Sequence, residues 1–174
     1  MDPETTFQTC VKEILDHEGG LTYAIGDAGG ITNWGISLRF LLKEDSEDHP
    51  SPKTIQYMTE EEAKGIYRKF WWDKYKYSTF SQLPVVEKVF DLAVNMGGFG
   101  AHKLLQIAIN RLLDKPIKVD GLLGQQTFSK ANSLNGNSLR QGLRECAKHR
   151  YIEIVADNPA MEWALKGWLN RARW

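Results

Sequence analysis

The sequence lacks an apolar run long enough to cross a membrane, since none of its hydrophobic stretches approaches the roughly 18 residues that a spanning helix needs. The N-terminal segment, MDPE, is acidic and has no basic stretch followed by an apolar one, so it does not resemble a secretory signal peptide. We therefore expect no stable membrane insertion and no export by the general secretory route. If the protein acts outside the cytoplasm, another factor must release it.

Cysteine is scarce, and histidine is not spaced for metal binding. The two cysteines, Cys10 and Cys146, lie far apart, without a C-x-x-C motif, on the apolar stripes of expected helices. Buried thiols are therefore favoured over a disulfide. Because the histidines show neither an H-x-x-x-H pattern nor mixed Cys/His spacing, we expect no metal and no cofactor. The histidines are His17, His49, His102 and His149.

Two common catalytic motifs are also absent. The chain has no G-x-S-x-G, so a nucleophilic serine hydrolase has no support. The glycine-rich segment at residues 97–100 has no expected strand before it and no Gly-Lys-Ser/Thr after it. A phosphate-binding loop is therefore disfavoured.

Charge of one sign is not in excess, since 22 Lys and Arg balance 22 Asp and Glu. A dedicated nucleic-acid binder normally has a basic excess, so this balance argues against that class. The balance hides an asymmetry: residues 1–100 hold 10 basic and 16 acidic residues, whereas residues 101–174 hold 12 and 6. The basic half could orient the protein on a polyanion such as a cell wall, or the two halves could simply attract each other.

Most of the chain has the periodicity of α-helices. Asp2 followed by Pro3 predicts the start of the first helix, and Gly19 and Gly20 predict its end. The apolar stripe of this helix comprises Phe7, Cys10, Val11, Ile14 and Leu15.

The rest of the chain, after the first helix, is predicted to form one small β element and further helices. Residues 20–37, rich in Gly, Thr and Asn, predict short strands, and residues 44–53 predict a solvated loop. Thr59 and Glu62 form a capping box for a helix through about Trp72. Further helices are expected at residues 38–43, 84–96, 101–113, 127–132, 139–155 and 161–171, with Trp163 and Trp168 spaced for a core. We predict one mainly α unit, of one or two lobes, because no linker or repeat divides the chain.

Glu18 is the most informative position for chemistry. Continuing the stripe of the first helix by helical spacing places Glu18 on the apolar face, where a carboxyl group loses hydration. It also falls in the last turn, where the negative end of the helix dipole disfavours ionisation. A general acid needs both effects if it is to hold a proton near neutral pH. The structural alternative is a helix-terminal Glu that turns to solvent or caps the following loop.

The segment after Glu18 adds groups suited to sugar chemistry. Asp27 follows Glu18 by nine residues, and an intervening turn could bring the two carboxyls face to face, as in glycoside hydrolysis. Thr32 could orient an attacking water. Alternatively, Asp27 is an ordinary turn residue and Thr32 an ordinary strand hydroxyl. Tyr23 and Asn33 add aromatic and amide groups that could contact sugar.

The motifs in this region resemble those of glycoside hydrolase family 108. HEGG at residues 17–20 and DAGGITNWGI at residues 27–36 are similar to the E-G-G-(aromatic) and D-x-G-G-x-T-x-x-G-I motifs of that family. The departure is Leu21, where the family commonly has an aromatic residue. Weaker similarities follow in the same order along the chain: FDLAVNMG at residues 90–97, VDGLLG at residues 119–124 before Thr127, and GWLNR at residues 167–171.

The resemblance implies a lysozyme-like α+β fold spanning residues 1–174, with a catalytic region at about 1–83 and a helical, peptidoglycan-binding-like half at about 84–174. The implied activity is that of a phage endolysin, an N-acetylmuramidase that cuts the β-1,4 bond between N-acetylmuramic acid and N-acetylglucosamine. Glu18 is then the general acid, assisted by Asp27 and Thr32. Tyr23, Asn33 and Asn95 are expected to contact substrate, although Asn95 could equally cap its helix near Gly97.

The resemblance also implies where and with what the enzyme works. The expected partner is the glycan strand of peptidoglycan, and the expected state is a monomer made in the host cytoplasm. Holin-assisted release would bring it to the periplasm and cell wall. Two rival functions stay open: a lytic transglycosylase, which uses one Glu and leaves an anhydro end, and a non-catalytic wall-binding or secretion-associated module. The acid on an apolar stripe argues against the second, since binding alone does not require one.

Overall fold

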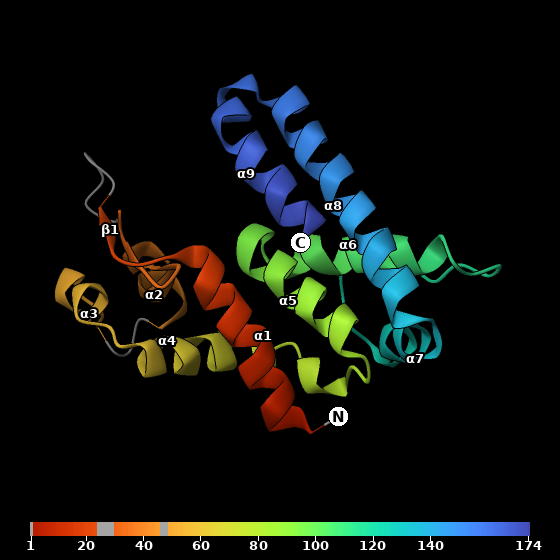
Figure 1. Cartoon of the computed structure of the whole chain (residues 1–174), viewed down its shortest axis with the longest axis horizontal. Coiled ribbons are helices and arrows are strands. Elements are labelled where there is room, and N and C mark those ends of the chain that lie inside the picture. Colours follow the sequence, from red (N-terminus) through yellow and green to blue (C-terminus); the bar gives the residue numbers. More distant parts are fainter. Residues whose placement is uncertain (1, 24–29, 46–48) are drawn as a thin grey trace. The chain divides into compact units, whose positions relative to one another are not determined.

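The computed structural model describes residues 2–23, 30–45 and 49–174, which form a mainly helical fold with one small antiparallel sheet (Figure 1). No helix within these ranges is long and apolar enough to cross a membrane. The chain divides into two compact units, Asp2–Lys74 and Tyr75–Trp174. The expected class, mainly α with a small β element after the first helix, is confirmed.

Helix α1 (Pro3–Glu18) opens the N-terminal unit as its sequence predicts. The Asp2 carboxylate accepts a hydrogen bond of 2.7 Å from the backbone N–H of Thr5, which satisfies one of the unpaired donors at the helix start. The whole expected apolar stripe, from Phe7 to Leu15, is buried. The helix ends at Gly19, whose φ of +74° is accessible to glycine at little cost.

The sheet contains β1 (Thr22–Tyr23), β2 (Ile31–Asn33) and β3 (Ile36–Ser37), in that order. Both neighbouring pairs are antiparallel, and β2 and β3 are joined by the two-residue turn of Trp34 and Gly35. Both turn residues have positive φ, at +52° and +76°, as expected for a tight hairpin whose twist matches its strands.

Three short α-helices complete the N-terminal unit: α2 (Leu38–Glu44), α3 (Pro52–Gln56) and α4 (Glu60–Tyr67). The prediction of a loop over residues 44–53 is wrong at its C-terminal end. Ser51 and Thr54 form a capping box there, and α3 begins at Pro52. The capping box of Thr59 and Glu62 is confirmed at the start of α4. The helical path beyond α4 continues as the π-helix Arg68–Asp73.

The C-terminal unit is built around α5 (Leu83–Met96), which packs against α6 (Gly98–Asn110) and α8 (Gly136–Asp157). Helix α9 (Glu162–Arg173) runs alongside α8 (Figure 1), and α7 (Gln125–Ser133) contacts both α6 and α8. Short 3-10 helices lie at Tyr77–Thr79 and Pro159–Met161. The expected core position of Trp163 is wrong: its side chain is 80% exposed, because α9 buries Ala164 and Ala172 instead.

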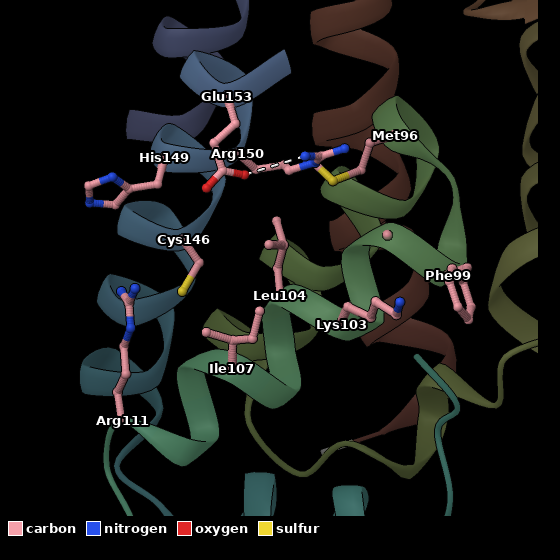
Figure 2. Close-up of a pocket in the computed structure, with 11 residues that line it drawn as sticks. Met96, Phe99, Lys103, Leu104, Ile107, Arg111, Cys146, His149, Arg150 and Glu153 are labelled. Atoms are coloured by element: carbon pink, nitrogen blue, oxygen red, sulfur yellow. Dashed lines mark hydrogen bonds and ion pairs between the residues drawn. The ribbon is translucent and has the colours of Figure 1, made fainter. Parts of the chain in front are cut away.

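A groove of about 420 Å³ lies on the C-terminal unit between α6 and α8 (Figure 2). Its floor is apolar and includes Leu104, Ile107 and the thiol of Cys146, whereas basic side chains stand around it. Burial raises the pKa of the Cys146 thiol, and the nearby Arg111 guanidinium acts in the opposite direction.

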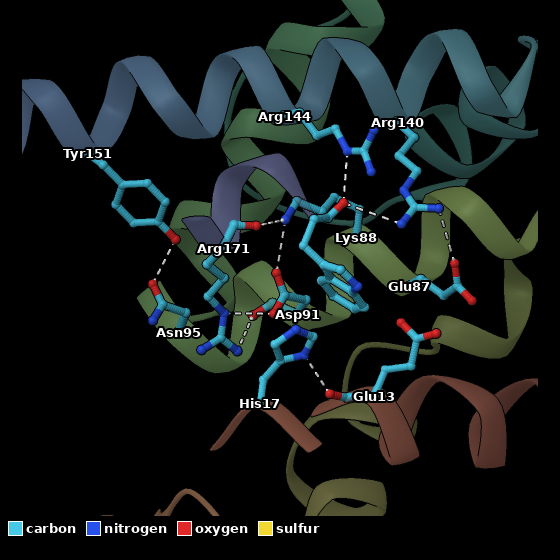
Figure 3. Close-up of polar contacts among 11 residues, drawn as sticks. Glu13, His17, Glu87, Lys88, Asp91, Asn95, Arg140, Arg144, Tyr151 and Arg171 are labelled. Carbon is cyan, nitrogen blue, oxygen red and sulfur yellow. Dashed lines mark hydrogen bonds and ion pairs between the residues drawn. The ribbon is translucent and has the colours of Figure 1, made fainter. Parts of the chain in front are cut away.

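A buried ion network joins α5 to α9 (Figure 3). The side chains of Lys88 and Asp91 are fully buried, with Nζ and Oδ2 3.1 Å apart. The other oxygen of Asp91, Oδ1, accepts a hydrogen bond of 2.7 Å from Nε of Arg171. Lys88 also donates to the backbone oxygen of Arg171 at 2.6 Å. Burial lowers the pKa of Lys88, and the Asp91 carboxylate opposes this effect. The charges are thus paired where water is excluded.

His102 is a second buried titratable group of the C-terminal unit. Its Nε2 lies 2.9 Å from the Tyr77 hydroxyl, and its Nδ1 lies 3.2 Å from the backbone oxygen of Gly121. A neutral ring satisfies both contacts if Nδ1–H donates to Gly121 and Nε2 accepts from Tyr77. Burial lowers the pKa of His102 from 6.5 to about 4, against the opposing effect of the Gly121 contact.

Acid should therefore destabilise the C-terminal unit through His102. Because the folded-state pKa lies below the unfolded one, the contribution of neutral His102 is complete above about pH 6.5 and is lost as the pH falls towards 4. The loss should reach about 3 kcal/mol of unfolding free energy. Urea unfolding between pH 7.5 and 4 measures it. The variant His102→Gln should show a clearly shallower pH dependence, and parallel losses in both proteins would contradict the assignment.

Candidate active site

Glu18 is the last residue of α1, and its side chain is half-buried. It follows directly from the buried stripe that ends at Leu15, as the helical spacing predicts. The following residue, Gly19, turns the chain away from the helix axis. The carboxyl group therefore sits at a helix end, between the apolar interior of the N-terminal unit and its surface.

The hairpin turn between β2 and β3 packs directly against Glu18. A Cβ atom added to Gly35 would lie 2.7 Å from both Cβ and Cγ of Glu18, and 2.6 Å from the hydroxyl oxygen of Tyr67. Real Cβ atoms do not approach other atoms so closely. Gly35 therefore has two reasons to be glycine: its φ of +76° and the stem of Glu18 against its backbone.

Several hydrogen bonds hold this turn in place. The hydroxyl of Tyr67, a buried residue of α4, donates to the backbone oxygen of Trp34 at 2.9 Å. The indole Nε1 of Trp34 donates to the backbone oxygen of Met58 at 3.0 Å. The turn is thus fixed to the segment around α3 and α4, and it provides a rigid wall for the side chain of Glu18.

The structure places Thr32 and Tyr23 on opposite faces of the sheet. Thr32 is half-buried and pairs across the strands with Thr22 and Ser37, so these three hydroxyl side chains share one face. Tyr23 pairs with Ile31 on the other face and is 61% exposed. The catalytic assistance predicted for Thr32 and the sugar contact predicted for Tyr23 therefore involve different sides of the sheet.

Asn33 already has partners within the fold. It is buried, and its Nδ2 donates to the backbone oxygens of Ile55 and Met58 at 3.1 and 3.3 Å. These bonds attach α3, and the short connection that leads from α3 to α4, to strand β2. Both amide hydrogens are thereby used within the fold, and the substrate contact of Asn33 stays a prediction.

Asn95 belongs to the C-terminal unit, in the last turn of α5. Its Oδ1 accepts a hydrogen bond of 2.7 Å from the hydroxyl of Tyr151 (Figure 3). The Tyr151 ring stacks on that of Trp168, with centroids 5.3 Å apart. The side chain of Asn95 is therefore oriented by α8 and α9, and its contact with substrate stays a prediction.

Asp27, the predicted partner of Glu18, lies outside the described residues, and its role stays a prediction. Among the residues that the structure describes, no cluster of three His, Cys, Asp or Glu side chains is arranged to hold a metal ion. Sequence reasoning missed Tyr67 as a supporting residue, because it lies far from Glu18 in the sequence. The sequence also did not predict that Gly35 lies against Glu18, although Gly35 is the second-to-last residue of the D-x-G-G-x-T-x-x-G-I motif.

Comparisons with known proteins cover nearly the whole chain. Residues 11–97 match the family model described as Glycosyl hydrolase 108, and residues 100–173 match that described as Predicted Peptidoglycan domain. The solved structure of SagA from Brucella abortus is similar in fold, with a TM-score of 0.77 and 23% identity, over 98% of this chain and 91% of that one. No curated protein matches.

The family boundary and the structural boundary differ. The family 108 match extends to residue 97 and so includes α5, whereas α5 packs within the unit that begins at Tyr75. The division into a catalytic region at about 1–83 and a helical half at about 84–174 stays a prediction. Since the first model matches half of the chain and includes Glu18 and its supporting hairpin, the protein belongs to glycoside hydrolase family 108 and is a glycoside hydrolase of peptidoglycan.

Proposed function

We propose that this hydrolase cuts the β-1,4 bond between N-acetylmuramic acid and N-acetylglucosamine, with Glu18 as the general acid. The observation that carries the proposal is that Glu18 is half-buried at the end of α1, with its Cβ and Cγ packed against the backbone of Gly35. Packing of the side-chain stem limits the positions that the carboxyl group can take, which favours proton transfer in a defined direction.

The proposed reaction begins with proton transfer from Glu18 to the glycosidic oxygen. The bond between that oxygen and the anomeric carbon of the muramic acid breaks, and positive charge develops on the sugar ring. A water molecule then supplies the hydroxyl group of the new reducing end, and the proton that it releases replaces the one that Glu18 gave to the leaving oxygen. Asp27, with Thr32, is proposed to stabilise the charged ring or to position this water.

The rival lytic transglycosylase shares the first step and differs in the second. There, the 6-hydroxyl of the muramic acid attacks its own anomeric carbon, so that no water enters and a 1,6-anhydro end results. Both enzymes can use a single glutamate as acid. Their products, rather than their acids, distinguish them.

Digestion of purified peptidoglycan should therefore release fragments with reducing muramic acid ends, and it should continue in EDTA. Borohydride reduction followed by mass spectrometry detects the ends: reducible muramic acid is expected. Anhydro-muramic acid would replace our proposal by the transglycosylase. Intact stem peptides freed from the glycan, without new sugar ends, would exclude both enzymes.

The biological setting is part of the same proposal and is supported by the motif resemblance. A phage endolysin made in the host cytoplasm would reach the periplasm and wall after holin-assisted release and would lyse the host. The glycan strand would be its main partner, and the enzyme would act as a monomer.

A further inference from the structure

Basic side chains surround the groove between α6 and α8 on the C-terminal unit. Lys103, Arg111 and Arg150 supply three cations at separate places around it (Figure 2). Among the described lining residues, Glu153 is the one carboxylate, and its Oε2 lies 3.3 Å from Nη1 of Arg150. The lining thus carries a net positive charge, and just outside it the carboxylate of Glu145 lies near enough to act on the Cys146 thiol.

The floor of the groove is apolar. Leu104, Ile107 and Cys146 lie between the basic side chains, and Phe99, 58% exposed, stands at one edge (Figure 2). Nζ of Lys103 lies 4.4 Å from the centroid of the Phe99 ring. This cation–π contact favours an ammonium position at the edge of the apolar floor. A complementary ligand would therefore carry separated anionic groups joined by small apolar ones.

We propose that the groove binds the stem peptide of peptidoglycan through its carboxylates. The stem peptide combines alanine methyl groups with the free carboxylates of γ-linked glutamate and, in many walls, diaminopimelate. The methyl groups suit the floor, and the carboxylates suit Lys103 and Arg111 through charge-assisted hydrogen bonds, whereas Arg150 is already paired with Glu153. The inference rests on the proposed function for the choice of polymer, whereas the groove indicates which part of that polymer it holds.

The glycan strand fits this groove less well. Uncharged sugars are held mainly by flat aromatic surfaces and by amide or carboxylate hydrogen bonds, and the described lining offers one phenyl ring, at its edge, and the imidazole of His149. An uncharged ligand over Lys103 and Arg111 would remove part of the hydration of these two cations without giving them a charged partner. The groove therefore has the chemistry of a peptide site, and its expected effect is to keep the enzyme on peptide-bearing strands.

Titration with a free stem peptide tests the site without any catalysis. The probe is the tetrapeptide L-Ala–γ-D-Glu–meso-diaminopimelate–D-Ala, added at low salt to the full chain labelled with ¹⁵N. The expected result is that amide signals of α6 and α8 around Lys103 and Arg150 shift, and that a peptide with amidated carboxylates shifts them much less. Equal shifts with both peptides, shifts confined to other surfaces, or no shifts would overturn the proposal.

Paired variants test the cations. The double variant Lys103→Gln/Arg111→Gln should weaken tetrapeptide binding at least about fivefold, since it removes two charged contacts. It should raise KM on intact peptidoglycan without lowering kcat, and leave cleavage of peptide-free glycan strands unchanged. The matched control is Lys115→Gln/Lys130→Gln, at exposed positions of the same unit outside the groove lining.

The two proposals fail in different ways. Equal weakening by the two double variants would assign the effect to overall charge and would overturn the peptide site, while the muramidase would stand if reducing ends still form. If wild-type protein forms no reducing ends, the proposed function fails, and the titration with tetrapeptide still decides the groove separately.

Discussion

Replacing Glu18 by glutamine is expected to lower the rate of peptidoglycan cleavage by at least about two orders of magnitude, because general acid catalysis contributes about 10² to 10⁴ in rate. Glutamine has nearly the same volume as glutamate, so the contact with Gly35 persists and no cavity opens. The amide cannot deliver a proton to the glycosidic oxygen. Folding and sedimentation with peptidoglycan should be unchanged.

The matched control is Glu13→Gln, the same chemical change on a half-buried residue of the same helix. It should retain near wild-type activity. Activity is measured as new reducing ends on purified walls, and folding by circular dichroism. A folded Glu18→Gln protein with near wild-type cleavage would reject Glu18 as the acid. If Asp27 only positions water, Asp27→Asn should lose less activity than Glu18→Gln.

Replacing Asp91 by alanine should produce the largest loss of stability, about 3 to 5 kcal/mol, because removal of one partner leaves buried charge uncompensated. Lys88 is fully buried and would lose its carboxylate 3.1 Å away, and Arg171 would lose its acceptor at 2.7 Å. The Lys88 ammonium would keep its bond to a backbone oxygen. Urea or thermal unfolding measures the loss.

A surface ion pair in the same unit provides the control for Asp91. Arg150 and Glu153 are exposed, and Glu153→Ala should leave the unfolding free energy almost unchanged, since solvent screens such pairs. The double variant Lys88→Met/Asp91→Leu should be more stable than Asp91→Ala alone, because it removes the second buried charge as well. Equal small losses for Asp91→Ala and Glu153→Ala would show that the buried network contributes little.

The parts of the fold that the sequence predicted well are those set by local rules. The start of α1 depends on Asp2 and Pro3, and the start of α4 on Thr59 and Glu62, so each is encoded within a few residues. The position of Glu18 follows from helical spacing in the same way. The hairpin of β2 and β3 was expected only as a short β element, because its register depends on the turn at Trp34 and Gly35.

The parts that were missed depend on residues far apart in the sequence. No local pattern links Tyr67 to Trp34, yet the bond between them fixes the wall behind Glu18. Asp91 reads as a polar residue on an amphipathic helix, and only the meeting of α5 with α9 buries it against Arg171. The boundary between the two compact units, after Lys74, likewise depends on tertiary packing, here of α5 on α6 and α8, and not on a local sequence pattern.

Each of the two compact units contains one cysteine whose chemical labelling can report on the opening of the structure around it. Cys10 lies in the N-terminal unit and Cys146 in the C-terminal unit, and both side chains are buried thiols. Because the exposed fractions are 2% and 3%, a thiol reagent reaches Cys10 only when the N-terminal unit opens, and it reaches Cys146 when the C-terminal unit opens or the groove that this thiol lines widens. The labelling rates of the two thiols, separated by peptide mapping, would thus report the opening of the structure around each thiol in the unmodified chain, without an engineered label.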